Sequence, residues 1–275
     1  MTQQRNRLKL LDSKAMEKAV HELIEQVPYN VKLIVKAAGA TELLLSKEID
    51  DVFSSASLIK VPILMAVLTH LERKNESLNQ LVKILPENHV EFSVLTELKT
   101  EECSLYELLV WMIIISDNTA TNVLIDFVGI GKLNDYFKEI GLMQTKLQRK
   151  MMDFVQLEKG YDNLTTASDM GLLFTAIYRK ELLSYQYSEL AIDLLSRQRV
   201  HESLKRYLVD DVRIAHKTGS LDAVEHDIGI VFTDKIDYII GVFVTNHTNN
   251  EEAKKLIGKI SKIVNQHLGK GQKSK

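Results

Sequence analysis

The sequence predicts an α+β fold: an antiparallel five-stranded sheet flanked by terminal helices, with an all-helical lobe inserted between its halves. Two observations carry this prediction. Segments typical of strands and hairpins cluster near both ends of the chain, whereas the long middle shows almost only helical periodicity. We therefore expect an α/β sandwich lobe at 1–52 plus 200–275, a helical lobe at 53–199, and an active site in the groove between them.

The N-terminal segment is predicted to form a helix and then a hairpin. Residues 13–26 carry apolar side chains at helical spacing. Strand-like runs follow at 31–37 and 42–46, and residues 38–40 (Ala-Gly-Ala) between them are typical of a tight turn. The apolar face of the helix is expected to consist of Met16, Val20, Leu23 and Ile24.

The C-terminal segment is predicted to supply three more strands, at 212–217, 226–233 and 238–246. A hairpin at 234–235 would join the last two. A final helix is expected over 251–267, because apolar side chains recur there every three or four residues.

The composition is that of an ordinary globular protein. The 275 residues are 45% hydrophobic and 26% charged, and the net charge is −2, so no nucleic-acid or membrane partner is indicated. We expect a monomer that acts on a small-molecule substrate. The basic tail at 270–275 is interpreted as a solvated chain end. Because no secretory signal or membrane span is recognisable, the chain as given is expected to be cytoplasmic, or secreted if an export segment has been removed.

Cysteine and histidine suggest no metal or cofactor site. Cys103 is the one cysteine and follows residues 101–102 (Glu-Glu), which raise a thiol pKa, so we expect it to be inert. None of the eight histidines forms a ligand-spaced pair. We predict no cofactor and no metal, a structural role for His216, and at most a minor substrate contact at 226–227 (His-Asp).

The first candidate site is Ser57 with Lys60. Positions i and i+3 of a helix share a face, so the amine can reach the hydroxyl. The run that contains Lys60 is strongly apolar, and burial lowers a lysine pKa, which makes a neutral, proton-accepting amine accessible. The alternative is a helix N-cap serine followed by a solvated lysine.

The second candidate site is 116–118 (Ser-Asp-Asn), which interrupts the apolar run at 108–115. Polar side chains in a buried segment must find partners or cost about 1–3 kcal/mol each. A helix break that faces the substrate meets this demand and gives a hydroxyl and an amide to the groove. The alternative is a helix stop followed by a cap for a helix over 119–128.

The third candidate site is 217–219 (Lys-Thr-Gly), at the end of the strand predicted over 212–217. Lys217 is expected to project into the groove, where an anionic substrate would meet it and the Thr218 hydroxyl. Gly219 would let a ligand approach the strand backbone closely. The alternative is an edge lysine and a glycine that enters a turn.

Together the three clusters resemble the class A β-lactamase-like serine hydrolases of the β-lactamase and penicillin-binding protein superfamily, whose motifs are S-x-x-K, S-D-N and K-T-G. The resemblance extends over nearly the whole chain and implies an α/β sandwich with a helical lobe. The matching segments are 53–62, 114–122, 165–170 and 214–220.

The resemblance implies catalytic roles for four residues. Ser57 would be the acylated nucleophile, and Lys60 would take or relay its proton. Ser116 would pass a proton to the leaving nitrogen. The backbone N–H groups of Ser57 and Ser220 would form the oxyanion hole.

The resemblance also implies substrate-binding roles. Asn118 would hold the substrate amide, and Phe92 would be the aromatic wall of the groove. Lys217, together with Thr218, would anchor a substrate carboxylate.

One departure concerns the base for deacylation. The lactamases of this family carry a glutamate in the segment that matches 147–153, and Met151 stands at that position here. Asp153 and Glu158 are the candidate replacements. Because general-base help is typically worth ~10²–10⁴ in rate, we expect an acyl-enzyme that forms but clears slowly.

Three functions follow in order of preference. The first is a serine β-lactamase that opens a β-lactam amide through an acyl-enzyme on Ser57. The second is a related serine esterase or amidase, or a penicillin-binding peptidase-like hydrolase, for which β-lactams are slow covalent inhibitors. The third is a non-catalytic binding protein, which is least favoured because no nucleophile group is damaged.

Overall fold

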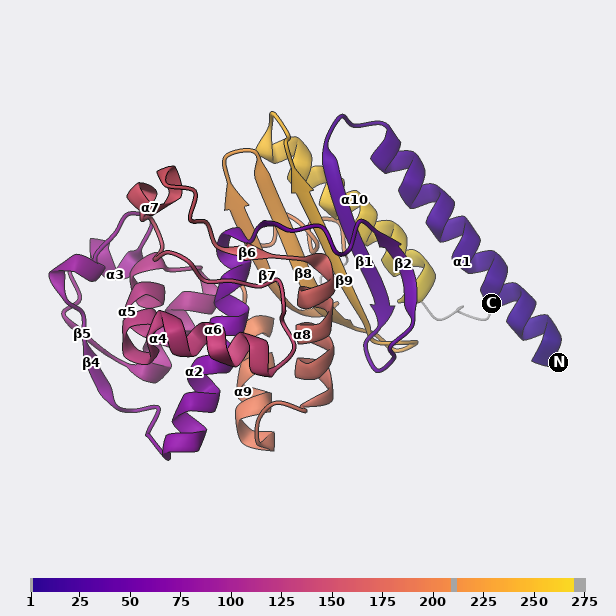
Figure 1. Cartoon of the computed structure of the whole chain (residues 1–275). Coiled ribbons are helices and arrows are strands. Elements are labelled where there is room, and N and C mark those ends of the chain that lie inside the picture. The colour runs from indigo at the N-terminus through magenta and orange to yellow at the C-terminus, as the bar shows by residue number, and fades with distance from the viewer. Residues whose placement is uncertain (1, 209–211, 270–275) are drawn as a thin grey trace.

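A five-stranded antiparallel sheet forms the middle of the molecule (Figure 1). The computed structural model describes residues 2–208 and 212–269. The strand order is β2-β1-β9-β8-β7, so the N-terminal hairpin joins the C-terminal strands where β1 pairs with β9. The predicted fold class is therefore confirmed. The strands are β1 (Asn30–Ala37), β2 (Leu43–Lys47), β7 (Arg213–Leu221), β8 (Val224–Phe232) and β9 (Tyr238–Thr245).

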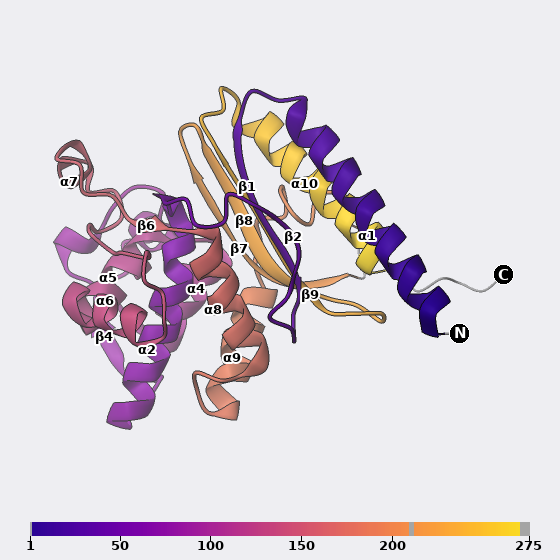
Figure 2. The same ribbon diagram turned by 45° about the vertical axis from the view of Figure 1, so that its right-hand side comes forward.

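Two terminal helices, α1 (Thr2–Glu25) and α10 (Asn250–Leu268), lie side by side on one face of the sheet (Figures 1 and 2). Buried side chains such as Val20, Val242 and Ile257 pack between these helices and the strands. The predicted start of the first helix at 13 was wrong, because the helix already begins at Thr2. The preceding residues contain no Gly or Pro that would stop the helix earlier. The predicted tail at 270–275 lies outside the described residues.

The helical lobe covers the opposite face of the sheet (Figure 2). Its centre is α2 (Lys60–Lys74), which is buried almost throughout. Helix α8 (Ala167–Arg179) approaches the sheet closely at Gly171, where a Cβ would lie 2.4 Å from Cδ1 of Ile34. The remaining helices are α3 (Val94–Glu97), α4 (Leu105–Ile114), α5 (Asn118–Val128), α6 (Ile130–Glu139), α7 (Phe154–Glu158) and α9 (Tyr185–Ser196), with 3-10 turns η1 (Ala56–Ile59) and η2 (Pro86–Asn88).

Two short strand pairs complete the lobe. Strand β4 (Leu81–Lys83) pairs with β5 (Glu102–Ser104), and β3 (Phe53–Ser54) pairs with β6 (Leu164–Thr165). The second pair holds the segment that precedes Ser57 against the chain that follows α7.

Strand β7 is longer than the sequence predicted. It pairs with β8 as far as Leu221 and Val224, so the Lys-Thr-Gly cluster at 217–219 lies inside the strand and not at its end. The turn comes at Ala223, whose φ of 57° is in the left-handed region. Because β7 is an edge strand, one side of its backbone is free to face the groove.

Candidate active site

A pocket of about 560 Å³ lies between the helical lobe and β7. Six of the eight residues predicted to act on a substrate line it, and the other two, Lys60 and Lys217, are fully buried. The three clusters therefore converge on one place. The six lining residues are Ser57, Phe92, Ser116, Asn118, Thr218 and Ser220.

Ser57 lies in the 3-10 turn η1, directly before α2 begins at Lys60. It is not an N-cap residue, so the structural alternative for this serine was wrong. The preceding Ala56 has a φ of 45°, a strained conformation for a residue with a side chain. Among the described residues the Ser57 hydroxyl has no hydrogen-bond partner, and it is not bonded to Lys60. The hydroxyl is half-buried at the wall of the pocket.

Lys60, the first residue of α2, connects this helix to the Ser-Asp-Asn cluster at 116–118. Its Nζ donates to the Ser116 carbonyl at 2.7 Å, to Ser116 Oγ at 3.1 Å and to Asn118 Oδ1 at 2.8 Å. Burial, and after it the neighbouring Lys217, lower the pKa of Lys60 well below that of an exposed lysine, whereas Asp117 acts in the opposite direction. The predicted environment for a proton-accepting amine is present, and the amine is directed at Ser116.

Ser116 lies between two lysines. Lys217 Nζ donates to Ser116 Oγ at 3.1 Å, the same distance as Lys60 Nζ, and to the Thr218 carbonyl at 2.8 Å. Ser116 adopts a φ of 62°, which is rare for a residue other than glycine. Burial lowers the pKa of Lys217 to about 7. Lys217 is fully buried and does not line the pocket, but its amine reaches Ser116, which does; its predicted role toward a substrate stays a prediction.

The Ser-Asp-Asn cluster combines the two interpretations considered for it. Asp117 is the N-cap of α5 and accepts from the Ala120 N–H at 2.8 Å and the Leu95 N–H at 3.2 Å. Its neighbours Ser116 and Asn118 face Lys60 and the pocket. The cap therefore fixes the backbone that presents the two functional side chains.

Phe92 forms the outer edge of the pocket and is 78% exposed. Its φ of 56° is in the left-handed region. The loop that carries it is linked to the site, since Asn118 Nδ2 donates to the Glu91 carbonyl at 3.4 Å. The predicted wall position is consistent with this placement.

Gly219 allows residues 55–57 of the protein, and not a ligand, to approach β7 closely. A Cβ at this position would lie 3.2 Å from the Ala56 Cβ, the Ser55 carbonyl oxygen and the Ser57 nitrogen. The glycine therefore lets β7 pack against η1, the turn that contains Ser57. The sequence analysis expected a ligand in the space beside Gly219, but residues 55–57 occupy it.

The segment from Arg149 to Asn163 forms the wall opposite β7. Arg149 Nε donates to Asp162 Oδ1 at 3.0 Å, and the side chain of Asn163 bonds the Arg149 backbone at N–H and carbonyl, each at 3.1 Å. Met151 is 7% exposed, and Asn122 hydrogen-bonds both its N–H and its carbonyl. The side chains that this segment contributes to the pocket are mainly apolar; they include Met151, Met152, Phe154 and Leu157.

The two candidate deacylation bases lie away from the pocket. Asp153 caps α7 by accepting from the Gln156 N–H at 3.1 Å. Glu158 is exposed at the last residue of α7. Neither is among the residues that line the pocket, so the structure does not bring them to Ser57.

The cysteine and the two histidines with predicted roles, His216 and His226, are buried. His216 is fully buried and its Nδ1 lies 2.9 Å from Asp227 Oδ1, which supports a structural role. His226 is also buried, with its Nε2 3.0 Å from the Ser54 carbonyl oxygen and away from the pocket lining. Burial raises the pKa of Cys103 to about 11, as expected for an inert thiol. Within residues 2–208 and 212–269, no group of three or more His, Cys, Asp or Glu side chains is placed to hold a metal ion.

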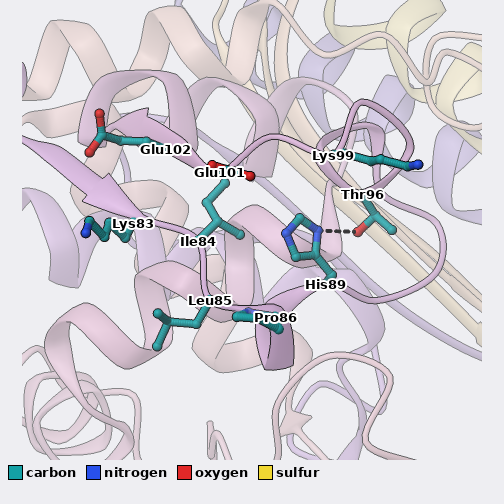
Figure 3. A pocket seen from close by; sticks show the side chains of 9 residues that line it. All are labelled: Lys83, Ile84, Leu85, Pro86, His89, Thr96, Lys99, Glu101 and Glu102. Atoms are coloured by element: carbon teal, nitrogen blue, oxygen red, sulfur yellow. Dashed lines mark hydrogen bonds between the residues drawn. The ribbon is translucent and has the colours of Figure 1, made fainter.

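A second cavity, of about 710 Å³, lies in the helical lobe between η2 and β5 (Figure 3). It contains none of the predicted site residues, and its charged side chains are exposed. Figure 3 shows one hydrogen bond among them, between His89 and Thr96, with Nδ1 and Oγ1 3.4 Å apart. Chemistry, and not size, therefore distinguishes the candidate active site.

Several pocket residues escaped the sequence analysis. Asp162 and Asn163 line the pocket and fix its wall, and Val200 and Leu221 add apolar surface. Their positions depend on how distant segments meet, and spacing along the chain gives no such information. The opposite charges of Arg149 and Asp162 at the two ends of one loop were the one available clue.

Fold and pocket together define a hydrolase of the β-lactamase fold. Residues 15–268 match the family described as the Beta-lactamase enzyme family, and the chain belongs to this family. No helix in the described part of the chain is both long and apolar enough to span a bilayer.

Individual relatives agree with this assignment. A β-lactamase of Bacteroides uniformis is 28% identical over 232 residues, which are 77% of this chain and 78% of that protein. The solved structure of PBP-A is 28% identical with a TM-score of 0.84, and the match covers 92% of this chain and 95% of PBP-A. A mutant of PBP-A in an acyl-enzyme complex with penicillin G is also 28% identical, with a TM-score of 0.84 and coverage of 92% and 96%.

Proposed function

We propose that this protein opens a β-lactam amide by acylating Ser57 and that it releases the acyl group slowly. The observation that carries the proposal is the pair of buried amines, Lys60 and Lys217, whose Nζ atoms both lie 3.1 Å from Ser116 Oγ beside the nucleophile. Such an arrangement can take a proton from a serine and deliver it to a leaving nitrogen.

Acylation begins when Ser57 Oγ attacks the lactam carbonyl and its proton moves to the neutral Lys60 amine. Hydrogen bonds of this kind are often long in an unliganded site and tighten when substrate binds. Ser116 then gives its proton to the lactam nitrogen as the C–N bond breaks and takes a proton back from Lys60, which returns to its neutral form. The N–H groups of Ser57 and Ser220 stabilise the developing oxyanion; close packing of Gly219 against the Ser57 nitrogen supports this pairing.

Slow release of the acyl group is expected from the wall opposite β7, the segment from Arg149 to Asn163. Met151 stands where a general base would activate the deacylating water. Asp153 caps α7 and Glu158 is exposed at the end of this helix, so neither carboxylate lines the pocket. Asp162 lines the pocket, but Arg149 holds its carboxylate. The acyl-enzyme complex of the PBP-A mutant with penicillin G supports acylation by a β-lactam in this fold.

The second candidate function is a serine esterase, amidase or penicillin-binding peptidase-like hydrolase that shares the acylation step. The buried amine of Lys217 favours it, because no exposed lysine offers itself to a β-lactam carboxylate at β7. In this case β-lactams act as slow inhibitors of another reaction.

Intact-protein mass spectrometry after addition of penicillin G tests the proposal. We expect a mass increase equal to one penicillin, located at Ser57 and absent in Ser57→Ala, that decays over many minutes. Rapid loss of the adduct would favour an efficient β-lactamase. A protein that acquires no adduct at Ser57 would overturn the proposed acylation.

A further inference from the structure

Lys60 and Lys217 lie too close together for both to carry a charge easily. Both amines are fully buried and contact the same oxygen, Ser116 Oγ, each at 3.1 Å. Two positive charges at this separation, shielded from water, repel each other strongly. Within the described residues neither amine bonds a carboxylate, and their partners are carbonyl, amide and hydroxyl oxygens. The pair is therefore expected to hold one charge and not two.

Each amine has one buried acid nearby that does not touch it. Asp117 lies in the chain between the two residues that bond Lys60, and it raises the pKa of this amine. Asp227 raises the pKa of Lys217 in the same way. Lys217 is opposite Ile228 in the register, and Asp227 is the next residue of β8, so its carboxylate lies on the other face of the sheet. Only the sheet backbone separates this acid from the Lys217 side.

The two acids differ in what compensates their charge. Asp117 is the N-cap of α5, where the positive end of the helix dipole offsets a carboxylate. Asp227 lies inside strand β8, and strands carry little net dipole. More of the charge of Asp227 is therefore left to act on its lysine.

Asp227 is fixed in place by two neighbours. Its Oδ2 accepts from the Leu204 N–H at 3.0 Å, and its Oδ1 lies 2.9 Å from His216 Nδ1. Gly229 is opposite His216 in the register, and a Cβ there would lie 2.5 Å from the His216 Cβ. The absence of a side chain at position 229 thus leaves the space that the imidazole uses to reach the acid.

The pair of His216 and Asp227 carries one net negative charge. An ionised carboxylate only accepts hydrogen bonds, so the imidazole proton is on Nδ1. His216 Nε2 is buried without a partner in the described part of the chain, and a second proton there would be an unpaired donor. The ring of His201 stacks on that of His216 at 5.8 Å. Burial, and after it Lys205 and Arg199, lower the pKa of His201, so this ring adds no positive charge at neutral pH.

The contacts of Lys60 fit an uncharged amine. A neutral amine has two N–H groups and one lone pair. The Ser116 carbonyl at 2.7 Å and Asn118 Oδ1 at 2.8 Å can only accept, so they take both protons. The third contact, with Ser116 Oγ, can run in either direction, because a hydroxyl both donates and accepts. Lys60 can therefore be neutral with all three of its contacts satisfied.

We infer that Asp227, held by His216 and Leu204, keeps the Lys217 amine positively charged while Lys60 is neutral, so that Ser116 lies between a proton donor and a proton acceptor. Asp227 is a positioning residue, since it does not line the pocket and acts through Lys217. Its effect on acylation rests on the proposed reaction of Ser57, whereas the division of charge between the two lysines does not.

An NMR titration of protein that is isotopically labelled at lysine Cε tests the division of charge. Exposed lysines titrate near about 10.4, so the two buried amines stand apart, and Lys60→Met and Lys217→Met assign their signals. In the wild-type protein Lys217 is expected to titrate near pH 7 and Lys60 at a lower pH. The reverse order would overturn the inference. This measurement needs no variant of Asp227, so it decides even if Asp227→Asn does not fold.

Asp227→Asn removes the charge and keeps the size of the side chain. The titration of Lys217 should move down by about one pH unit or more, because a nearby opposite charge favours the charged amine. A loosened fold would instead move it up, toward the value of an exposed lysine, so the direction separates charge from a structural role. Asp234→Asn, in the exposed turn after β8, is the matched control and should leave the titration in place. If Asp227→Asn leaves the Lys217 titration unchanged or raises it, the inference is wrong.

The pH dependence of acylation by penicillin G connects this charge to the reaction. The rate constant should fall as Lys217 loses its proton, near pH 7 in the wild-type protein. In Asp227→Asn the fall should begin about one unit lower, so at about pH 8 the variant reacts about 10-fold more slowly. An alkaline limb that stays in place while the Lys217 titration moves would overturn the role of Asp227 in acylation. Expected titrations without any adduct at Ser57 would refute the proposed acylation and leave the division of charge intact.

Discussion

The two sides of the pocket are built in opposite ways. On one side Lys60, Ser116 and Lys217 form a buried network in which each polar group has a partner. On the other side Met151 is held by its backbone, and the side chains toward the pocket are mainly apolar. If the proposed acylation holds, the groups that form the covalent intermediate and those that would hydrolyse it belong to separate segments.

Burial has a different consequence on each side. In the lysine network it lowers the pKa of both amines, to about 7 for Lys217, which favours their neutral, proton-accepting forms. In the wall around Met151 the side chains toward the pocket are mainly apolar, and the Asp162 carboxylate is paired with Arg149.

The largest expected effect is on the lysine side. Lys60→Met removes the amine that accepts the Ser57 proton, so the rate constant for acylation by penicillin G should fall by about 10²–10⁴-fold. Lys74→Met, at the exposed end of the same helix, is the matched control and should acylate at the wild-type rate. Equal rates for Lys60→Met and Lys74→Met would mean that the network has no role in acylation.

The next effect concerns the apolar wall. Met151→Glu introduces a carboxylate among the residues that line the pocket, and the Ser57 adduct should then decay about 10²-fold faster. Met151→Gln has a similar size and no basic group, so its adduct should be as long-lived as that of the wild type. If both variants release the acyl group at the same rate, this wall does not determine deacylation.

A third test uses the pH dependence of stability. Burial lowers the pKa of Lys217 to about 7 in the folded protein, whereas the ordinary value is 10.5. Between these values the unfolded chain binds more protons, so the free energy of unfolding should rise with pH by up to about 1.4 kcal/mol per unit. Below pH 7 both states are protonated and this contribution is constant. Urea unfolding across this range should show a flatter profile for Lys217→Met; superimposable profiles would contradict the shifted pKa.

The smallest expected effect tests the contact between β7 and the nucleophile turn. In Gly219→Ala the new Cβ would lie 3.2 Å from three atoms of residues 55–57, so the turn must shift by a few tenths of an ångström. Acylation should slow by about 10-fold, because small displacements of reacting groups are costly. Gly131→Ala has no atom within 4 Å and a backbone that tolerates a side chain, so it controls for the loss of glycine. Identical acylation rates in the two variants would show that the contact is not needed.

The sequence predicted the sheet and the three clusters because both depend on local pattern. Alternating apolar residues located the strands, and the spacing between Ser57 and Lys60 indicated a shared site. It could not predict that the Lys217 amine is fully buried and bonded to Ser116, because the partner of a side chain depends on which segments the fold brings near. The pairing of Ser220 with Glu225 required knowledge of where the hairpin turns, and the predicted strand ended too early to show it.

The pairing of β1 with β9 has a consequence for how the protein is made. Asn30 is opposite Thr245, so the sheet stays open until nearly all of the chain has left the ribosome. During synthesis the helical lobe can assemble first from neighbouring segments, while the strand that carries Lys217 is still missing. Reactivity toward a covalent probe would then report the completion of folding, because the nucleophile gains its full set of neighbours only in the last stage.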